Sequence, residues 1–133
     1  MARRRTLLCS VITPEAVVLE SEATFVALPA HDGEVGVLLD RAPLVCKLGV
    51  GELRVVTLDD TRHYLLDGGF AQVLDNEVSV LTGRAVPVEQ LRRDEAQKAL
   101  QQALAMSVTD DASLAARQTA LARARVSLRL ARQ

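Results

Sequence analysis

The residues from His31 to Leu44 read HDGEVGVLLDRAPL, and the rest of the chain is organised around this stretch. The apolar run before it, Thr24–Leu28, predicts a strand. His31-Asp32-Gly33 then predicts a turn, because glycine adopts a positive φ without a Cβ clash, and Ala42-Pro43 predicts an extended exit, because the residue before a proline avoids the α region. The predicted product is a rigid loop that exposes Glu34, Asp40 and Arg41. The alternative interpretation is an ordinary loop of a β-sandwich with solvated charges.

Short apolar and β-branched runs separated by turn residues continue as far as Thr82. Gly49-Val50-Gly51, Asp59-Asp60, Gly68-Gly69 and Asp75-Asn76 separate them, and such residues tolerate tight or positive-φ turns. Residues 1–84 are therefore predicted to form a β-sandwich domain with about eight to ten short antiparallel strands. Besides Thr24–Leu28, the predicted strands are Leu7–Thr13, Val17–Glu22, Leu44–Leu48, Glu52–Leu58, Arg62–Leu66, Phe70–Leu74 and Val78–Thr82.

A change of pattern predicts a helical domain at residues 85–133. Pro87 is tolerated in the first turn of a helix, and Glu89–Met106 has leucine and alanine at helical spacing with charged residues and glutamines opposite. Asp111 is placed to cap a second helix, Ala112–Arg132. Two helices with a short connection form an antiparallel αα-hairpin. Because its seam is mostly alanine and leucine, we expect the hairpin to be marginal alone and to dock on the sandwich or on a partner.

The composition indicates a soluble or peripheral globular chain. It has 133 residues, 49% of them hydrophobic, and a net charge of −1, and no apolar run approaches the roughly 18 residues that span a bilayer. The basic start at Arg3-Arg4-Arg5 precedes an apolar run that Thr13-Pro14-Glu15 interrupts too early for a signal peptide, so we expect an exposed basic end. Cys9 and Cys46 have aliphatic neighbours, which favours reduced, buried thiols and the cytoplasm.

No pattern in the chain predicts an active site. The two histidines, His31 and His63, have no cysteine or carboxylate at metal-ligand spacing, and the chain has no P-loop or Gly-x-Gly-x-x-Gly motif. The acidic pairs Asp59-Asp60 and Asp110-Asp111 fall at predicted turns or caps, where carboxylates make local hydrogen bonds. We therefore expect no catalytic residue, no metal and no cofactor.

The end of the chain is purely basic. Residues 112–133 contain five arginines and no acidic residue. The alternatives are a solvated basic face, a nucleic-acid site or a site for an acidic protein. Phe25, Tyr64 and Phe70 are the only aromatic residues and all lie in predicted strands, which leaves no stacking platform for nucleic acid. We therefore predict an acidic protein surface as the partner and no nucleic acid.

Several motifs resemble one family when they are taken together. They are PAHDGEVGVL at 29–38, APL at 42–44, DGGFAQV at 67–73, VSVL at 78–81 and ALARA at 120–124. This combination, which extends from about Leu7 to Ala131, resembles the epsilon-subunit family of the rotary F-type ATP synthase. The sequence departs from the family at Leu39-Asp40-Arg41, where the family usually has Pro-Gly-His.

The resemblance implies a noncatalytic subunit of the central stalk, peripheral to the cytoplasmic face of the inner (plasma) membrane. The sandwich would bridge the gamma subunit and the membrane-embedded c-ring, with Glu34, Asp40 and Arg41 facing the ring, and would couple gamma rotation to ion flow during ATP synthesis. The coupled ion, H⁺ or Na⁺, stays open because its ligands belong to the ring. In this family the hairpin can extend to the catalytic beta subunit and block ATP hydrolysis. The inhibitory residues would then be Arg117, Arg123, Arg125 and Arg129.

Some bacterial members of this family bind ATP on the hairpin through an Ile/Leu-Asp-x-x-Arg-Ala motif and arginines of the second helix. The corresponding run, residues 88–93, keeps an acid as Glu89 and the basic Arg92, but has Arg93 in place of alanine. Arg123 matches one second-helix arginine. The longer acid and the bulkier Arg93 predict no tight ATP binding. The competing function is a stand-alone small-ligand-binding sandwich with a helical dimerisation tail.

Overall fold

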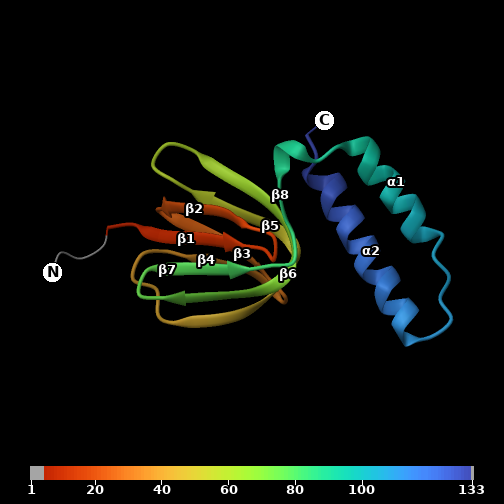
Figure 1. The fold of residues 1–133 in the computed structure, drawn as a ribbon, viewed down its shortest axis with the longest axis horizontal. Helices are drawn as coiled ribbons and strands as arrows, with labels where there is room; N and C mark the ends of the chain where they lie inside the picture. The colour runs from red at the N-terminus through yellow and green to blue at the C-terminus, as the bar shows by residue number, and fades with distance from the viewer. Residues whose placement is uncertain (1–4, 133) are drawn as a thin grey trace. The chain divides into compact units, whose positions relative to one another are not determined.

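The structure of this chain is a computed structural model that describes residues 5–132 (Figure 1). The chain divides into two compact units, residues 1–85 and 86–133. The predicted basic end lies outside the described residues except for Arg5, which is exposed. Within residues 5–132, no helix has the length and apolar character needed to cross a membrane.

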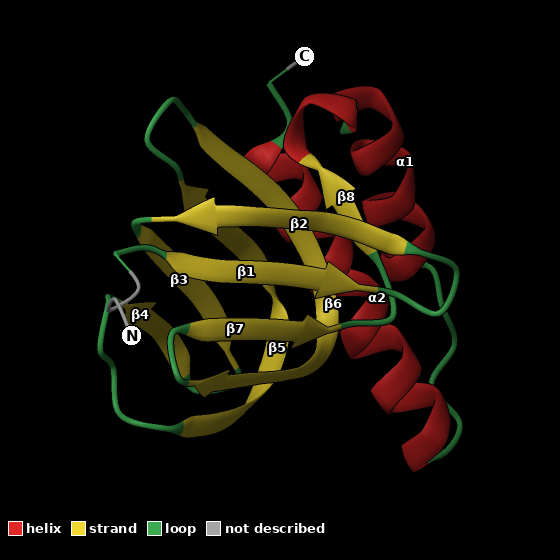
Figure 2. Cartoon of the chain, turned by 60° about the vertical axis from the view of Figure 1, so that its left-hand side comes forward, coloured by secondary structure: helices red, strands yellow, loops and turns green. Residues whose placement is uncertain are grey.

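The first unit is built from strands β1 to β7, and the short strand β8 spans the boundary between the two units. Their hydrogen-bonded order is β2-β1-β7-β6-β5-β3-β4, with β8 paired to β6. Figure 2 shows β1, β2 and β7 in a layer in front of β3 and β4, so the predicted β-sandwich is confirmed. The pairs among β1 to β7 are antiparallel except for β1 with β7, which are parallel, so the purely antiparallel prediction is wrong for this pair. The strands are β1 (Leu7–Ile12), β2 (Val17–Ala23), β3 (Phe25–Ala30), β4 (Gly33–Val37), β5 (Leu44–Val56), β6 (Thr61–Leu74), β7 (Glu77–Leu81) and β8 (Ala85–Pro87).

The core lies between the layers and follows the two-residue period of the strands. In β1, Leu7, Cys9 and Val11 are fully buried, and the residues between them are half-buried. Every strand from β1 to β7 contributes to this core. Its largest fully buried side chains are Leu7, Leu28, Leu53, Leu66, Val11, Val26, Val37, Val55, Val73, Val78 and Val80.

β5 and β6 each continue through glycines that the sequence predicts to be turns. The turns predicted at Gly49-Val50-Gly51 and Gly68-Gly69 are wrong, because β5 spans 13 residues and β6 spans 14, with one register on both sides of the glycines. Close packing explains two of these glycines instead, Gly51 against Pro29 and Gly69 against β7. Gly69 has φ 109°, and a Cβ there would overlap the carbonyl oxygen of Leu81 on β7. The first two of the four short strands predicted between residues 44 and 74 therefore form the single strand β5, and the other two form β6. β5 and β6 together make one long hairpin.

β4 lies inside the stretch that the sequence predicts to be a loop. Gly33–Val37 pairs with β3 in antiparallel register, from Ala30↔Gly33 to Val26↔Val37. Val37 is buried and Val35 half-buried, whereas Glu34 and Gly36 are exposed. This alternation is typical of a strand with one face on the core, so the rigid-loop prediction is wrong for these five residues.

The second unit is the predicted αα-hairpin, and its helices begin at different residues from those predicted. A 3₁₀ turn, η1 (Val88–Gln90), precedes α1 (Arg93–Leu104). Leu91 and Arg92 have an extended backbone and separate the turn from the helix. α2 (Asp111–Leu130) is capped by Asp110 rather than by Asp111. The Ser113 backbone N–H donates to Asp110 Oδ1 at 2.8 Å, and the Asp110 N–H donates to Ser113 Oγ at 3.1 Å. Hydrogen bonding from Ser113 to the Asp110 carboxylate, mainly from the Ser113 backbone N–H, lowers the pKa of that carboxyl.

Candidate functional site

Glu34 lies on β4 and is paired with an arginine that sequence reasoning missed. Its side chain is 59% exposed, and Arg54 Nη2 of β5 donates to Glu34 Oε1 at 2.8 Å. Strand β3 lies between these two strands, and Arg54 is opposite Ala27, which is opposite Gly36. The short residues on this row leave room for the Arg54 side chain to cross β3.

The ion pair continues into a chain of polar contacts across β5 and β6. Arg54 Nε lies 3.9 Å from Glu52 Oε1, and Glu52 Oε2 lies 3.2 Å from His63 Nδ1. Arg54 and His63 are directly opposite each other on the two strands. The two residues lie in consecutive predicted strands, Glu52–Leu58 and Arg62–Leu66, but the sequence analysis assigned no cross-strand register to these strands.

Asp40 and Arg41 form a corner in the connection between β4 and β5. Asp40 has φ 64°, and its N–H donates to Asn76 Oδ1 at 2.6 Å. The Asn76 side-chain amide donates back to Asp40 Oδ1 at 3.2 Å. The Arg41 N–H donates to the Leu38 carbonyl at 3.3 Å, and the Arg41 side chain is exposed. Asn76 was predicted only as a turn residue, with no signal for a contact 36 residues away.

The structure does not bring Glu34 and the Asp40–Arg41 corner together. Glu34 is the second residue of β4, beside the β3–β4 turn, whereas Asp40 and Arg41 follow the other end of β4. At a rise of about 3.3 Å per residue, Glu34 lies roughly 13 Å along the strand from Leu38. The three side chains therefore belong to two separate surfaces.

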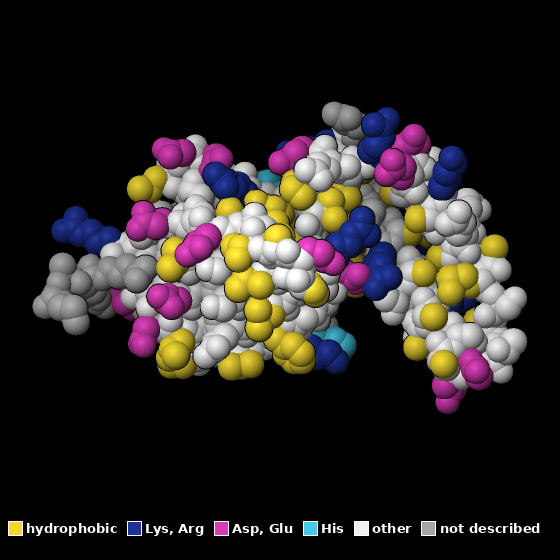
Figure 3. Space-filling model, in the orientation of Figure 1, with side chains coloured by type: hydrophobic (Ala, Val, Ile, Leu, Met, Phe, Trp, Pro, Cys, Tyr) yellow, Lys and Arg dark blue, Asp and Glu magenta, His cyan; other side chains and the backbone are white. Residues whose placement is uncertain are grey.

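An exposed apolar row crosses the outer face of the β2-β1-β7-β6 strands. Direct cross-strand pairs join Val17 to Ile12, Ile12 to Leu81 and Leu81 to Phe70. Val17 is 58% exposed, Leu81 54% and Phe70 56%, while Ile12 is half-buried. Figure 3 shows hydrophobic side chains gathered across the strands on this unit. We call these four residues the apolar row; contiguous exposed apolar surface of this kind marks interaction sites.

The basic side chains of α2 are mostly exposed. Arg117 is half-buried, whereas Arg123, Arg125 and Arg129 are exposed. Inside the hairpin, the buried residues of the two helices are small except for one leucine. They are Ala96 and Ala103 of α1, and Leu121 and Ala124 of α2.

The residues matched to the nucleotide motif lie on three different elements. Glu89 is in η1, Arg92 is the N-cap of α1 and pairs with Asp94 at 3.7 Å, and Arg123 is on α2. A shallow hollow beside Arg92 is lined by Arg92, Arg93, Asp94 and Gln97, and neither Glu89 nor Arg123 lines it.

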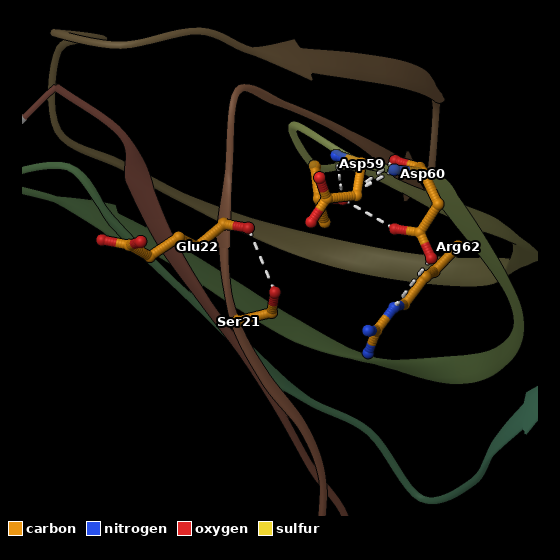
Figure 4. A network of polar contacts seen from close by, with 6 residues as sticks. Ser21, Glu22, Asp59, Asp60 and Arg62 are labelled. Atoms are coloured by element: carbon orange, nitrogen blue, oxygen red, sulfur yellow. Dashed lines mark hydrogen bonds and ion pairs between the residues drawn. The ribbon is translucent and has the colours of Figure 1, made fainter.

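A pocket of about 260 Å³ lies beside the β5–β6 turn. Thr57 Oγ1 donates to Asp60 Oδ1 at 2.6 Å and accepts from the Asp59 and Asp60 backbone N–H groups, and Asp60 pairs with Arg62 at 3.7 Å (Figure 4). These bonds close the turn on itself. Among the described residues, no group of three His, Cys, Asp or Glu side chains could hold a metal ion.

The two cysteines are free thiols. Burial raises the pKa of Cys9 to about 12, and burial is also the main cause of the raised pKa of Cys46, which is half-buried. Thiols with raised pKa values are poor nucleophiles at neutral pH.

Comparisons with known proteins agree with the fold and the motifs. Residues 6–88 match the model of the "ATP synthase, Delta/Epsilon chain, beta-sandwich domain". The chain is 49% identical to an ATP synthase epsilon chain of Rhodopirellula baltica, covering 93% of this chain and 97% of that one. It is 37% identical to an epsilon chain of Nitratidesulfovibrio vulgaris, covering 92% and 96%. A chain of the Euglena gracilis mitochondrial ATP synthase structure "OSCP/F1/c-ring in rotational state 1" has a TM-score of 0.84 at 26% identity, covering 94% of this chain and 81% of that chain. The resemblance seen in the sequence is thus confirmed, and the chain belongs to the ATP synthase delta/epsilon family.

Proposed function

We propose that this chain is a noncatalytic subunit of the central stalk of a rotary ATP synthase and couples rotation of the gamma subunit to the membrane-embedded c-ring. Family membership supports the complex, and the apolar row supports a permanent partner within it. In this proposal residues 1–84 bind gamma and the ring, and residues 85–133 regulate. The subunit is peripheral to the cytoplasmic face of the membrane, and the ring determines whether the coupled ion is H⁺ or Na⁺.

The gamma subunit is the proposed partner of the apolar row. Three of its four side chains are more than half exposed, although the sandwich has a complete core of its own. Burying such side chains in an interface releases roughly 25 cal/mol per Å² of apolar surface. A partner that rotates with the subunit leaves this face covered throughout the cycle, and this removes the aggregation hazard of the exposed row.

The ring is the proposed partner of the charged surfaces, with Glu34 contributing one contact and the Asp40–Arg41 corner another. Glu34 is supported by its exposure and by the Arg54 pair that holds its side chain in one direction. Arg41 is supported by its exposure at a hydrogen-bonded turn. Both would meet polar loops at the rim of an interface, where charged residues determine how the two partners are oriented more than how tightly they bind.

The hairpin is the proposed regulator. Arg117, Arg123, Arg125 and Arg129 lie on a helix without acidic residues after Asp111, which suits an acidic surface of the catalytic beta subunit in an extended state. The longer acid Glu89 and the bulkier Arg93, in place of the aspartate and alanine of the family motif, support the expectation that the hairpin binds no ATP tightly.

Copurification with gamma tests the main proposal. Phe70→Asp and Leu81→Asp each place a charge in the apolar row, and we expect both to abolish copurification with the gamma subunit while the melting temperature stays nearly unchanged. Leu58→Asp is the matched control, because Leu58 is 82% exposed but lies at the β5–β6 turn, away from the row. A stable homodimer of the wild-type chain without affinity for gamma would support the competing ligand-binding sandwich.

ATP hydrolysis by the assembled enzyme tests the hairpin. Truncation after Met106 should raise hydrolysis without preventing assembly, and replacing Arg117, Arg123 and Arg125 with Gln should reproduce part of the increase with a weaker salt dependence. Arg92→Gln with Arg93→Gln removes two arginines outside α2 and should leave hydrolysis unchanged. Unchanged hydrolysis in both hairpin variants would remove the regulatory role.

A further inference from the structure

One corner of the sandwich contains every non-glycine residue with a positive φ among residues 5–132. These are Asp40 at 64° in the β4–β5 connection, and Asp75 at 50° and Asn76 at 62° in the β6–β7 turn. The left-handed backbone is unfavourable for residues with a Cβ, although Asn and Asp tolerate it best. Such conformations persist where the surrounding structure fixes them.

Two side-chain hydrogen bonds fix this corner. Asn76 Oδ1 accepts from the Asp40 N–H at 2.6 Å, and Asn76 Nδ2 donates to Asp40 Oδ1 at 3.2 Å. Asn76 is itself attached to the sheet, because its carbonyl oxygen accepts from the Leu8 N–H of β1 at 2.9 Å. We call the two side-chain bonds the Asp40–Asn76 clamp. It joins the β4–β5 connection to a turn that is 36 residues away and anchored to β1.

The clamp holds the backbone of the residue that directly precedes Arg41. Arg41 follows Asp40 directly, and its N–H closes the turn onto Leu38 at 3.3 Å, while its side chain is exposed. A change in φ of Asp40 would redirect the chain at Arg41. The resembling family usually has a glycine at the position of Asp40, and glycine would hold this backbone less firmly.

We propose that Asn76 is a positioning residue that, through the Asp40–Asn76 clamp, directs the Arg41 guanidinium toward oxygen acceptors on the polar loops of the ring. The inference rests on the proposed function, in which this corner meets the ring. Asp40 is then part of the support of Arg41, in addition to any contact of its own with the ring.

The first test measures the clamp in the full-length chain without any partner. Asn76→Gly keeps the positive φ accessible and removes both side-chain bonds, so hydrogen exchange at the Asp40 amide should accelerate by about tenfold or more. Asp75→Asn is the matched control, since it changes the neighbouring positive-φ residue and leaves the clamp in place. An unchanged Asp40 exchange rate in Asn76→Gly would overturn the inference.

The second test measures ATP synthesis per ion translocated in the assembled enzyme. Arg41→Gln and Asn76→Gly should each lower this coupling, and Asn76→Gly should have no further effect in the Arg41→Gln background, because Asn76 acts through Arg41. A loss that adds fully to that of Arg41→Gln would overturn the positioning role. If Arg41→Gln lowers coupling and Asn76→Gly does not, the inference fails and the proposed function survives. If neither Arg41→Gln nor Asn76→Gly affects coupling, the positioning role of Asn76 is wrong, and so is the proposed contact of this corner with the ring.

Discussion

The two units of the chain bury very different cores. The sandwich core takes leucines, valines and a tyrosine from seven strands, whereas the buried residues of α1 and α2 are three alanines and Leu121. A buried CH₂ group contributes about 0.8 kcal/mol, so alanine contributes little to such a core. The difference teaches that the sandwich carries most of the buried apolar side chains, so we expect the packing between the helices to be the weaker of the two.

The largest expected effect comes from a cavity in the sandwich. Leu53→Ala removes a fully buried side chain of β5 and should lower the free energy of unfolding by about 3 kcal/mol, because the packed layers cannot close the space. Thermal denaturation of the full-length chain measures it. Val45→Ala is the control, because Val45 is 71% exposed on the same strand, and we expect a change within about 0.5 kcal/mol. Equal losses in the two variants would contradict the sandwich core described here.

A cavity in the hairpin should have a smaller and more local effect. Leu121→Ala should cost about 2 kcal/mol, because the alanines around it can approach one another. Hydrogen exchange should then accelerate in α1 and α2 and stay unchanged in β1 to β7. Leu104→Ala, at an α1 position that is 45% exposed, is the control. Equal acceleration in the strands would show that the two units unfold together, which breaks the comparison.

The cap of α2 predicts a pH dependence confined to the hairpin. Hydrogen bonds to Ser113 lower the pKa of Asp110 from 3.8, so the charged cap stabilises α2 fully above 3.8 and loses this contribution as the pH falls through the lowered pKa. Helicity followed by circular dichroism between neutral pH and pH 2 measures it. Asp110→Asn keeps an acceptor without the charge, and it should remove this pH dependence while retaining most of the helicity. A pH profile that is the same in Asp110→Asn would assign the effect to other carboxyl groups.

The smallest effect on stability is expected at the Glu34–Arg54 ion pair. Both side chains are more than a third exposed, so breaking the pair should change the free energy of unfolding by about 0–1 kcal/mol. Glu34→Arg should nevertheless weaken coupling in the assembled enzyme, and the double variant Glu34→Arg with Arg54→Glu restores the pair with reversed charges. If the double variant recovers stability and not coupling, Glu34 contacts the ring directly. If the double variant recovers both stability and coupling, coupling requires the Glu34–Arg54 ion pair and not a direct contact of Glu34 with the ring.

Local patterns predicted the elements that local physics determines. The apolar run of β1 and the helical spacing of α2 are visible within a few residues, so both elements were predicted close to their observed bounds. The glycines of β5 and β6 were misread, because a glycine that allows close approach of Leu81 looks the same in sequence as one that makes a turn.

The surfaces depend on cross-strand register, which a single sequence does not contain. Arg54 reaches Glu34 across 20 residues, and Asn76 reaches Asp40 across 36. The apolar row likewise appears only when β2, β1, β7 and β6 are aligned. Glu34, Asp40 and Arg41 were predicted as contact residues from residue type and resemblance, whereas the hydrogen-bond partners of Glu34 and Asp40 required the structure.

The unbroken β5–β6 hairpin has a mechanical consequence for a part that turns with a shaft. Because β5 pairs with β3 at one end and β6 pairs with β7 at the other, the same two backbones belong to both layers. A torque applied to the β7 side reaches the β3 side through covalent chain and a continuous ladder of hydrogen bonds, without depending on sliding apolar contacts between layers. The sandwich should therefore twist as one stiff body under load, and its compliance should lie outside these two strands.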